Sequence, residues 1–101
     1  MEVFAAPARD RCQVIREHRQ GRLIAEDTGL GLQRTDRVVI IQVTEQGRSD
    51  SQKKALYTAL ARSLEARAGI SPSDLVVSVV ANTPADWSFG LGRAQFQEGD
   101  L

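Results

Sequence analysis

The feature that most constrains the fold is a strand–helix–strand pattern in the middle of the chain. The apolar run RVVIIQVT over residues 37–44 is continuous and predicts a strand covered on both faces. A second apolar run, LVVSVV over residues 75–80, predicts another strand. Because a helical pattern joins the two runs, the sequence predicts a βαβ unit with parallel strands and a right-handed crossover.

The connecting helix has recognisable start and stop signals, and residues 46–48 form the turn before it. Ser49 and Gln52 have the spacing of a capping box, which satisfies free amide groups at a helix start. Gly69 suits a left-handed helix end, and Pro72 prevents continuation. The apolar stripe recurs at helical spacing and consists of Leu56, Leu60, Leu64, Ala55, Ala59 and Ala68.

The first third of the chain has weaker signals. Residues 11–17 are compatible with one more strand, and residues 23–24 and 27–32 with extended and turn-like segments. A length of 101 residues suits a single domain, residues 1–101. Three strands and one helix leave apolar surface uncovered, so we expect either assembly with copies of the chain or a missing part of the fold.

Composition excludes several function classes. The 13 basic and 13 acidic residues give a formal net charge of zero, which argues against a nucleic-acid or acidic-membrane surface. No apolar run approaches the roughly 20 residues that span a bilayer, and the first ten residues are a poor secretion signal. The lone Cys12 permits no internal disulfide and favours a cytoplasmic location. One His and one Cys cannot build a zinc site of the usual kind, so no metal is predicted.

Three stretches of the chain together resemble a known family. They are PARDRCQVIREH (residues 7–18), RTDRVVIIQVTEQGRSDSQKKALYTALARSLE (residues 34–65) and DLVVSVVANTPADWSFGLGRAQF (residues 74–96). They resemble the tautomerase superfamily, and in particular its malonate semialdehyde decarboxylase-like branch. The resemblance implies an α+β fold of two consecutive β-α-β units, assembly into trimers, and proton transfer by an N-terminal proline without a cofactor.

The chain departs from that family pattern at its start. Family chains begin with the catalytic proline, followed by a strand and a helix, before a segment like residues 7–11. Here Met1 is followed by Glu2. The resemblance therefore implies a truncated first unit, short by roughly 25–30 residues, beside one complete βαβ unit. On this interpretation the chain has impaired catalysis.

Arg48 and Gln46 are candidate residues for holding a carboxylate. A guanidinium between a strand and a helix start suits a carboxylate, and the resemblance implies that role for Arg48. The alternative is a solvated turn arginine. In the family's decarboxylases a second arginine occupies the position of Gln46, so the neutral amide favours tautomerisation over decarboxylation. Gln46 is equally compatible with a polar turn residue.

The remaining candidates lie near the two ends of the chain. The resemblance implies that Asp10 activates water or assists proton transfer, and the alternative is a cap or turn aspartate. It places Trp87 and Phe89 at the mouth of the active site, where aromatic surface excludes water. The alternative for Trp87 is packing at a subunit contact. His18 is expected to be structural or exposed, and a further group of basic residues to be surface or interface charges: Arg16, Arg19, Arg22 and Arg34.

Two functions follow from these observations. The first is a tautomerase-like enzyme that acts on a small 2-oxo or enol carboxylate, as a homo-oligomer and most simply a trimer. The alternative is a non-catalytic oligomeric relative that binds a small molecule or has a structural role. A weaker third hypothesis keeps activity by letting Asp10 alone act as the base.

Overall fold

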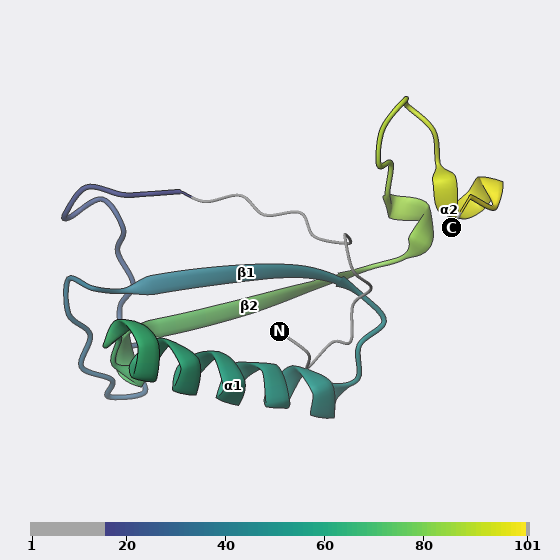
Figure 1. Cartoon of the computed structure of the whole chain (residues 1–101). Coiled ribbons are helices and arrows are strands. Elements are labelled where there is room, and N and C mark those ends of the chain that lie inside the picture. The colour runs from purple at the N-terminus through teal and green to yellow at the C-terminus, as the bar shows by residue number, and fades with distance from the viewer. Residues whose placement is uncertain (1–15, 101) are drawn as a thin grey trace.

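The structure is a computed structural model that describes residues 16–100. Its regular elements are β1 (Val39–Gln46), α1 (Asp50–Ala68), β2 (Leu75–Asn82) and three short helices: η1 (Pro72–Asp74), η2 (Pro84–Asp86) and α2 (Gln95–Glu98). The two strands are parallel and lie side by side, with α1 along one face (Figure 1). The predicted α+β class and the complete βαβ unit are confirmed.

Both strands extend further toward their carboxyl ends than the apolar runs predict. The ladder runs from the pair Val39 and Leu75 to the pair Gln46 and Asn82. The expected turn at Gln46 is therefore wrong, because its backbone pairs with β2. The predicted strand over residues 11–17 lies mostly outside the described part of the chain, and its last two residues, 16 and 17, have no regular structure.

The predicted helix signals are confirmed at both ends of α1. Ser49 Oγ accepts from the Gln52 amide at 3.2 Å, and Gln52 Oε1 accepts from the Ser49 amide at 2.9 Å. Gly69 takes the left-handed conformation with φ of 64°, which glycine adopts at little cost. Arg37 adds a cap that the sequence did not reveal, because its guanidinium donates to the carbonyls of Ala68 and Gly69 at 2.9 and 3.2 Å. A cation at this end complements the helix dipole.

The core lies between α1 and the sheet, and no other described element, within residues 16–100, covers the opposite face of the sheet. Leu56 and Ile70 are buried. Within residues 16–100, Ile40 and Val80 are 39% and 53% exposed on the face away from α1. Coverage of the strand on both faces, as the continuous apolar run predicted, is therefore not seen in the described residues. The helix stripe also contributes less than predicted, because Ala55 and Ala68 are exposed.

A buried carboxylate ties the loop before β1 to the start of β2. Asp74 is 2% exposed and accepts 2.6 Å hydrogen bonds from both the amide and the hydroxyl of Thr35. These bonds, with the charges of Arg34 and Arg37, lower the pKa of Asp74 against the opposing effect of burial. Arg34 donates to the carbonyls of Ser73 and Glu26 at 2.8 and 2.9 Å. Its predicted role as a surface or interface charge is therefore wrong: it is half-buried and structural.

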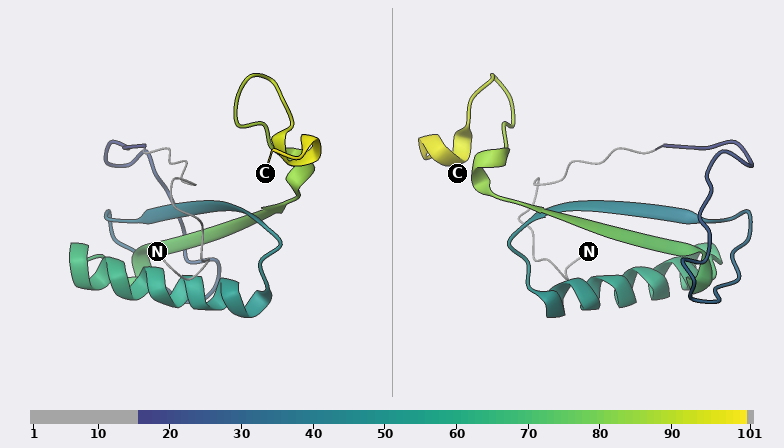
Figure 2. Two further views of the ribbon diagram at one scale, coloured as in Figure 1. Left: turned by 45° about the vertical axis from the view of Figure 1, so that its right-hand side comes forward. Right: turned by 180° about the vertical axis from the view of Figure 1, so that it is seen from behind.

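The chain after β2 leaves the body of the molecule. It continues through η2, a wide loop and α2 on the side of the sheet away from α1 (Figure 2). Within residues 16–100, no helix has the length and apolar character needed to cross a membrane.

Candidate functional site

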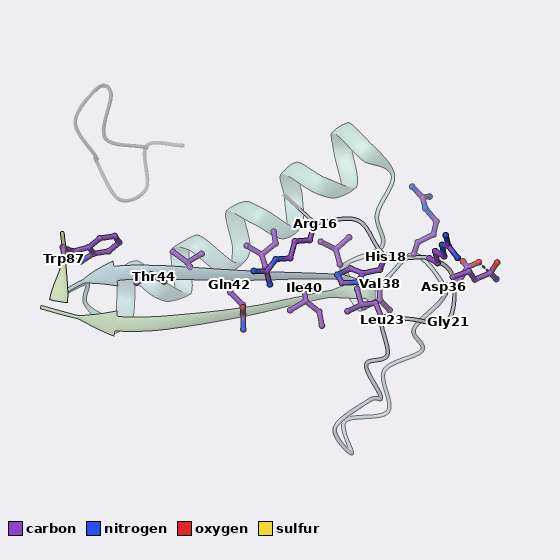
Figure 3. Close-up of a pocket in the computed structure, with 16 residues that line it drawn as sticks. Arg16, His18, Gly21, Leu23, Asp36, Val38, Ile40, Gln42, Thr44 and Trp87 are labelled. Atoms are coloured by element: carbon purple, nitrogen blue, oxygen red, sulfur yellow. Dashed lines mark hydrogen bonds between the residues drawn. The ribbon is translucent and has the colours of Figure 1, made fainter. Parts of the chain in front are cut away.

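Four polar or aromatic residues gather where the two parallel strands end, and this region is called the carboxyl edge below. Gln46 ends β1 and Asn82, its partner in the ladder, ends β2. Arg48 follows β1 by two residues, and Trp87 lies at the same end of the sheet (Figure 3). Parallel strands bring their carboxyl ends together, so one edge collects side chains that are distant in sequence.

A buried carboxylate fixes the turn that carries Arg48. Glu45 is 5% exposed, and its Oε2 accepts from the backbone amide of Arg48 at 2.7 Å. Its other oxygen lies 3.9 Å from Nζ of Lys53, on the first turns of α1. Because Ser49 is the N-cap, Arg48 stands directly before the positive end of a 19-residue helix. Arg48, whose side chain is half-buried, therefore lies at a helix start, where the local electrostatic potential favours an anion.

A hydrogen bond draws Trp87 back to the end of β2. Its indole Nε1 donates to Oδ1 of Asn82 at 2.9 Å. The short helix η2 makes this return possible, and Asp86 stabilises it by accepting from the amide and hydroxyl of Thr83 at 2.7 and 2.9 Å. These two bonds lower the pKa of the Asp86 carboxyl.

Phe89 extends the aromatic surface that Trp87 begins. The two rings stack with centroids 5.2 Å apart and planes 3° from parallel, and Phe96 meets Phe89 edge-on at 5.6 Å. Gln95 closes the intervening loop by accepting from the Phe89 amide at 3.0 Å and donating to the Gly90 carbonyl at 2.9 Å. Phe89 remains 41% exposed. The aromatic segment is thus both packed internally and open on one side.

A trough of about 1230 Å³ runs along β1 on the open side of the sheet. Trp87 lines one end, Arg16 lies beside the middle of β1, and His18 and Asp36 lie toward the other end (Figure 3). His18 is exposed, as expected, and so are the three arginines of its segment: Arg16, Arg19 and Arg22. Of the residues at the carboxyl edge, Trp87 lines this trough.

The structure thus brings Gln46, Arg48, Trp87 and Phe89 to one end of the molecule, while Asp10 lies outside the described residues. Sequence analysis missed Asn82 and Glu45. Asn82 follows the apolar run of β2 by two residues, and a polar residue so near a strand end is a usable signal. In the described part of the chain, no three His, Cys, Asp or Glu side chains are grouped for a metal ion.

A family model and individual relatives all identify similarity to tautomerases. The family model described as "Tautomerase enzyme" matches residues 10–90. The chain is 48% identical over 101 residues to the probable tautomerase YrdN of Bacillus subtilis strain 168, covering all of this chain and 78% of that protein. It is 35% identical over 99 residues to the probable tautomerase YusQ of the same strain, covering 97% of this chain and 78% of that protein.

Solved structures give the same result for the fold. A malonate semialdehyde decarboxylase, solved in wild-type, mutant and inactivated forms, matches with a TM-score of 0.87 and 48% identity. That match covers 98% of this chain and 77% of the other. A malonate semialdehyde decarboxylase inhibited by 3-bromopropiolate matches with a TM-score of 0.90 and 46% identity, over 99% of this chain and 76% of the other.

Proposed function

The chain belongs to the tautomerase enzyme family, in the branch that resembles malonate semialdehyde decarboxylase, and from that premise we propose that it acts on a small 2-oxo or enol carboxylate. The proposed reaction moves a proton between carbon and oxygen and needs no cofactor, because a base and a cationic carboxylate clamp are sufficient for it.

The observation that carries this proposal is the composition of the carboxyl edge. Arg48 supplies a cation directly before the start of α1, and the amides of Gln46 and Asn82 end two paired strands beside it. A carboxylate suits the cation, and a carbonyl or enol oxygen suits the neutral amides. Trp87 and Phe89 provide a flat apolar surface that packs on an unsaturated carbon chain and excludes water.

The residue proposed for the proton transfer is assigned from the family resemblance. We propose that Asp10 assists the transfer. In the family such a carboxylate works beside the secondary amine of the N-terminal proline, an amine that the sequence beginning Met1-Glu2 does not show. An ionised carboxylate near a cationic amine stays charged and orients water or substrate. One relative of known structure is inhibited by 3-bromopropiolate, itself a small carboxylate.

The neutral side chain at Gln46 favours proton transfer over decarboxylation. An arginine there would add a second positive charge, which stabilises the charge that develops when carbon dioxide leaves. Glutamine donates hydrogen bonds without that charge. The substrate we propose therefore keeps its carboxylate. A trimer and a cytoplasmic location stay predictions.

The test is an enol–keto conversion assay with phenylenolpyruvate, followed by ultraviolet absorbance. We expect the wild-type protein to accelerate ketonisation and Arg48→Ala to lower kcat/KM at least about tenfold, the effect of removing one charge-assisted contact. Arg62→Ala, an exposed arginine on α1, is the matched control and should keep wild-type kinetics. Saturable binding without turnover would contradict the enzyme proposal. It would favour the alternatives predicted from the sequence, a chain with impaired catalysis or a non-catalytic relative that binds a small molecule.

A further inference from the structure

We infer that Asn82 positions Trp87 and supplies the second neutral hydrogen-bond donor of the carboxyl edge, so that the site selects monocarboxylates with one carbonyl or enol oxygen. This inference rests on the proposed function and names a residue and a substrate class within it. Asn82 stands out because it is half-buried at the end of β2 and is bonded to the aromatic segment.

The register of the sheet brings Gln46 and Asn82 together at the carboxyl edge. Gln46 and Asn82 are partners across a parallel ladder, so their side chains project from the same face. Neighbouring strands lie about 4.8 Å apart, which places the two side-chain amides beside each other. Because Trp87 is bonded to Asn82, the partner of Gln46, its indole lies at the edge of the sheet where the Arg48 turn begins.

The bond between Trp87 and Asn82 determines the orientation of the Asn82 amide. An indole N–H donates and cannot accept, so the partner atom on Asn82 must be the carbonyl oxygen. The amide orientation is therefore fixed by chemistry. With Oδ1 engaged, the Nδ2 amino group has no partner within residues 16–100 and is available to a ligand.

Two contacts hold the indole of Trp87 in place. Trp87 is half-buried and is held by the bond at its nitrogen and by the parallel stack on Phe89 at 5.2 Å. Phe89 is in turn fixed through Gln95. Loss of the Asn82 bond would leave the indole attached only through stacking and the η2 turn, so its orientation over the carboxyl edge would no longer be fixed.

The charges of the proposed ligand-binding side chains at the carboxyl edge favour a monoanionic ligand. One guanidinium and two neutral amides suit one carboxylate and one uncharged oxygen. A second carboxylate placed on the amides would lose hydration without meeting a cation, which costs binding free energy. The edge should therefore bind 2-oxobutanoate more tightly than 2-oxoglutarate.

The experiment combines tryptophan fluorescence with calorimetric titration of 2-oxobutanoate and 2-oxoglutarate. Trp87 is the only tryptophan, so emission reports its surroundings alone. Asn82→Leu should shift the emission to the red, raise quenching by acrylamide, and weaken 2-oxobutanoate binding about tenfold. Asn82→Asp keeps the oxygen acceptor, so emission should stay like wild type, while binding falls at least about tenfold through like-charge repulsion.

Trp87→Phe removes the indole N–H and keeps an aromatic ring, and it gives a second measure if Asn82→Leu folds poorly. The loss of affinity caused by Asn82→Asp should persist in the Trp87→Phe background, because that loss comes from the edge and not from the indole. In the Trp87→Phe background, Asn82→Leu should reduce 2-oxobutanoate affinity less than it does in the wild-type protein, because the Trp87–Asn82 hydrogen bond is already absent.

Unchanged emission in Asn82→Leu would overturn the positioning role. Unchanged 2-oxobutanoate affinity in both Asn82 variants, with Arg48→Ala weakening binding, would overturn the donor role while the proposed function stands. Equal affinity of the wild-type protein for the two ligands would overturn the selectivity. If Arg48→Ala leaves binding unchanged, the proposed function fails and the substrate class fails with it, and the emission of Asn82→Leu still decides the positioning role.

Discussion

The indole of Trp87 donates a 2.9 Å hydrogen bond to Asn82, whose backbone pairs with Gln46 at the end of the sheet. One contact thus ties the segment that follows β2 back to the end of the sheet, next to the strand that leads into the Arg48 turn. Without it, the aromatic surface would belong to a separate projecting segment. With it, Trp87 is held at the edge of the sheet where the Arg48 turn begins, which is the basis of the proposed chemistry.

Gln46→Arg tests how charge at the carboxyl edge sets the choice of substrate. A second guanidinium beside Arg48 would meet the second carboxylate of a dianion, so 2-oxoglutarate affinity should rise about tenfold. Affinity for 2-oxobutanoate should change less. Calorimetric titration of both ligands measures the ratio, and Gln33→Arg, an exposed residue in the loop before β1, is the control. A ratio that stays at the wild-type value would show that position 46 does not contact the ligand.

Glu45 is expected to stabilise the Arg48 turn through the backbone. Glu45→Leu removes the acceptor of the Arg48 amide and should lower the free energy of unfolding by about 1–3 kcal/mol, the cost of a buried unsatisfied donor. Glu45→Gln keeps an oxygen acceptor and should cost less. Urea unfolding followed by circular dichroism gives both values. Equal losses in the two variants would mean that the ion pair with Lys53, and not the amide bond, is the stabilising contact.

Ser49→Ala tests the capping box of α1. The substitution removes the Oγ acceptor of the Gln52 amide, and the expected loss in the free energy of unfolding is about 1 kcal/mol. Thr58→Ala, on an exposed turn in the middle of α1, is the control and should be neutral or slightly stabilising. Chemical unfolding of both variants provides the comparison. A loss as small as that of Thr58→Ala would indicate that solvent replaces the cap.

Asp74 should make the fold sensitive to acid. Its pKa lies below the ordinary value of 3.8 because Thr35 and the nearby arginines favour the ionised form. The stabilisation is therefore complete above about pH 4 and is lost as the pH falls through the lowered pKa. Asp74→Asn should be less stable at neutral pH and should show a flatter decline on acidification. The control is the exposed Asp36→Asn.

The acid profile has a second contributor, because Thr83 lowers the pKa of Asp86 in the same direction. Part of the decline should therefore persist in Asp74→Asn. Thermal unfolding between about pH 2 and 7 covers both transitions. A profile of Asp74→Asn that overlays that of wild type would mean that the Thr35 bonds do not favour the ionised carboxylate.

The βαβ unit could be predicted because its signals are local. The apolar runs, the Ser49 cap and the left-handed Gly69 each depend on a few consecutive residues. The strand ends could not be predicted, because Gln46 and Asn82 are polar and only the register across the crossover reveals that they pair. Arg34 was misjudged for a related reason: its partner Ser73 lies 39 residues away in sequence, so no local pattern reveals the contact.

In the candidate site, too, the features with local sequence signals could be predicted and those that depend on long-range contacts could not. Arg48 and Gln46 are adjacent in sequence to a predictable turn, so their shared location followed from the strand–helix junction. The position of Trp87 depends on a side-chain bond to Asn82 and on the return of the chain through η2. Neither has a sequence pattern of its own. Asp10 lies outside the described residues, and its role stays a prediction.

The most direct test of the account is the calorimetric affinity of the protein for 2-oxobutanoate, compared between wild type, Arg48→Ala and the control Arg62→Ala. The account predicts that Arg48→Ala raises Kd at least about tenfold, or about 1.4 kcal/mol, and that Arg62→Ala does not. An Arg48→Ala protein that is folded and binds 2-oxobutanoate as wild type does would contradict the claim that the carboxyl edge holds a carboxylate.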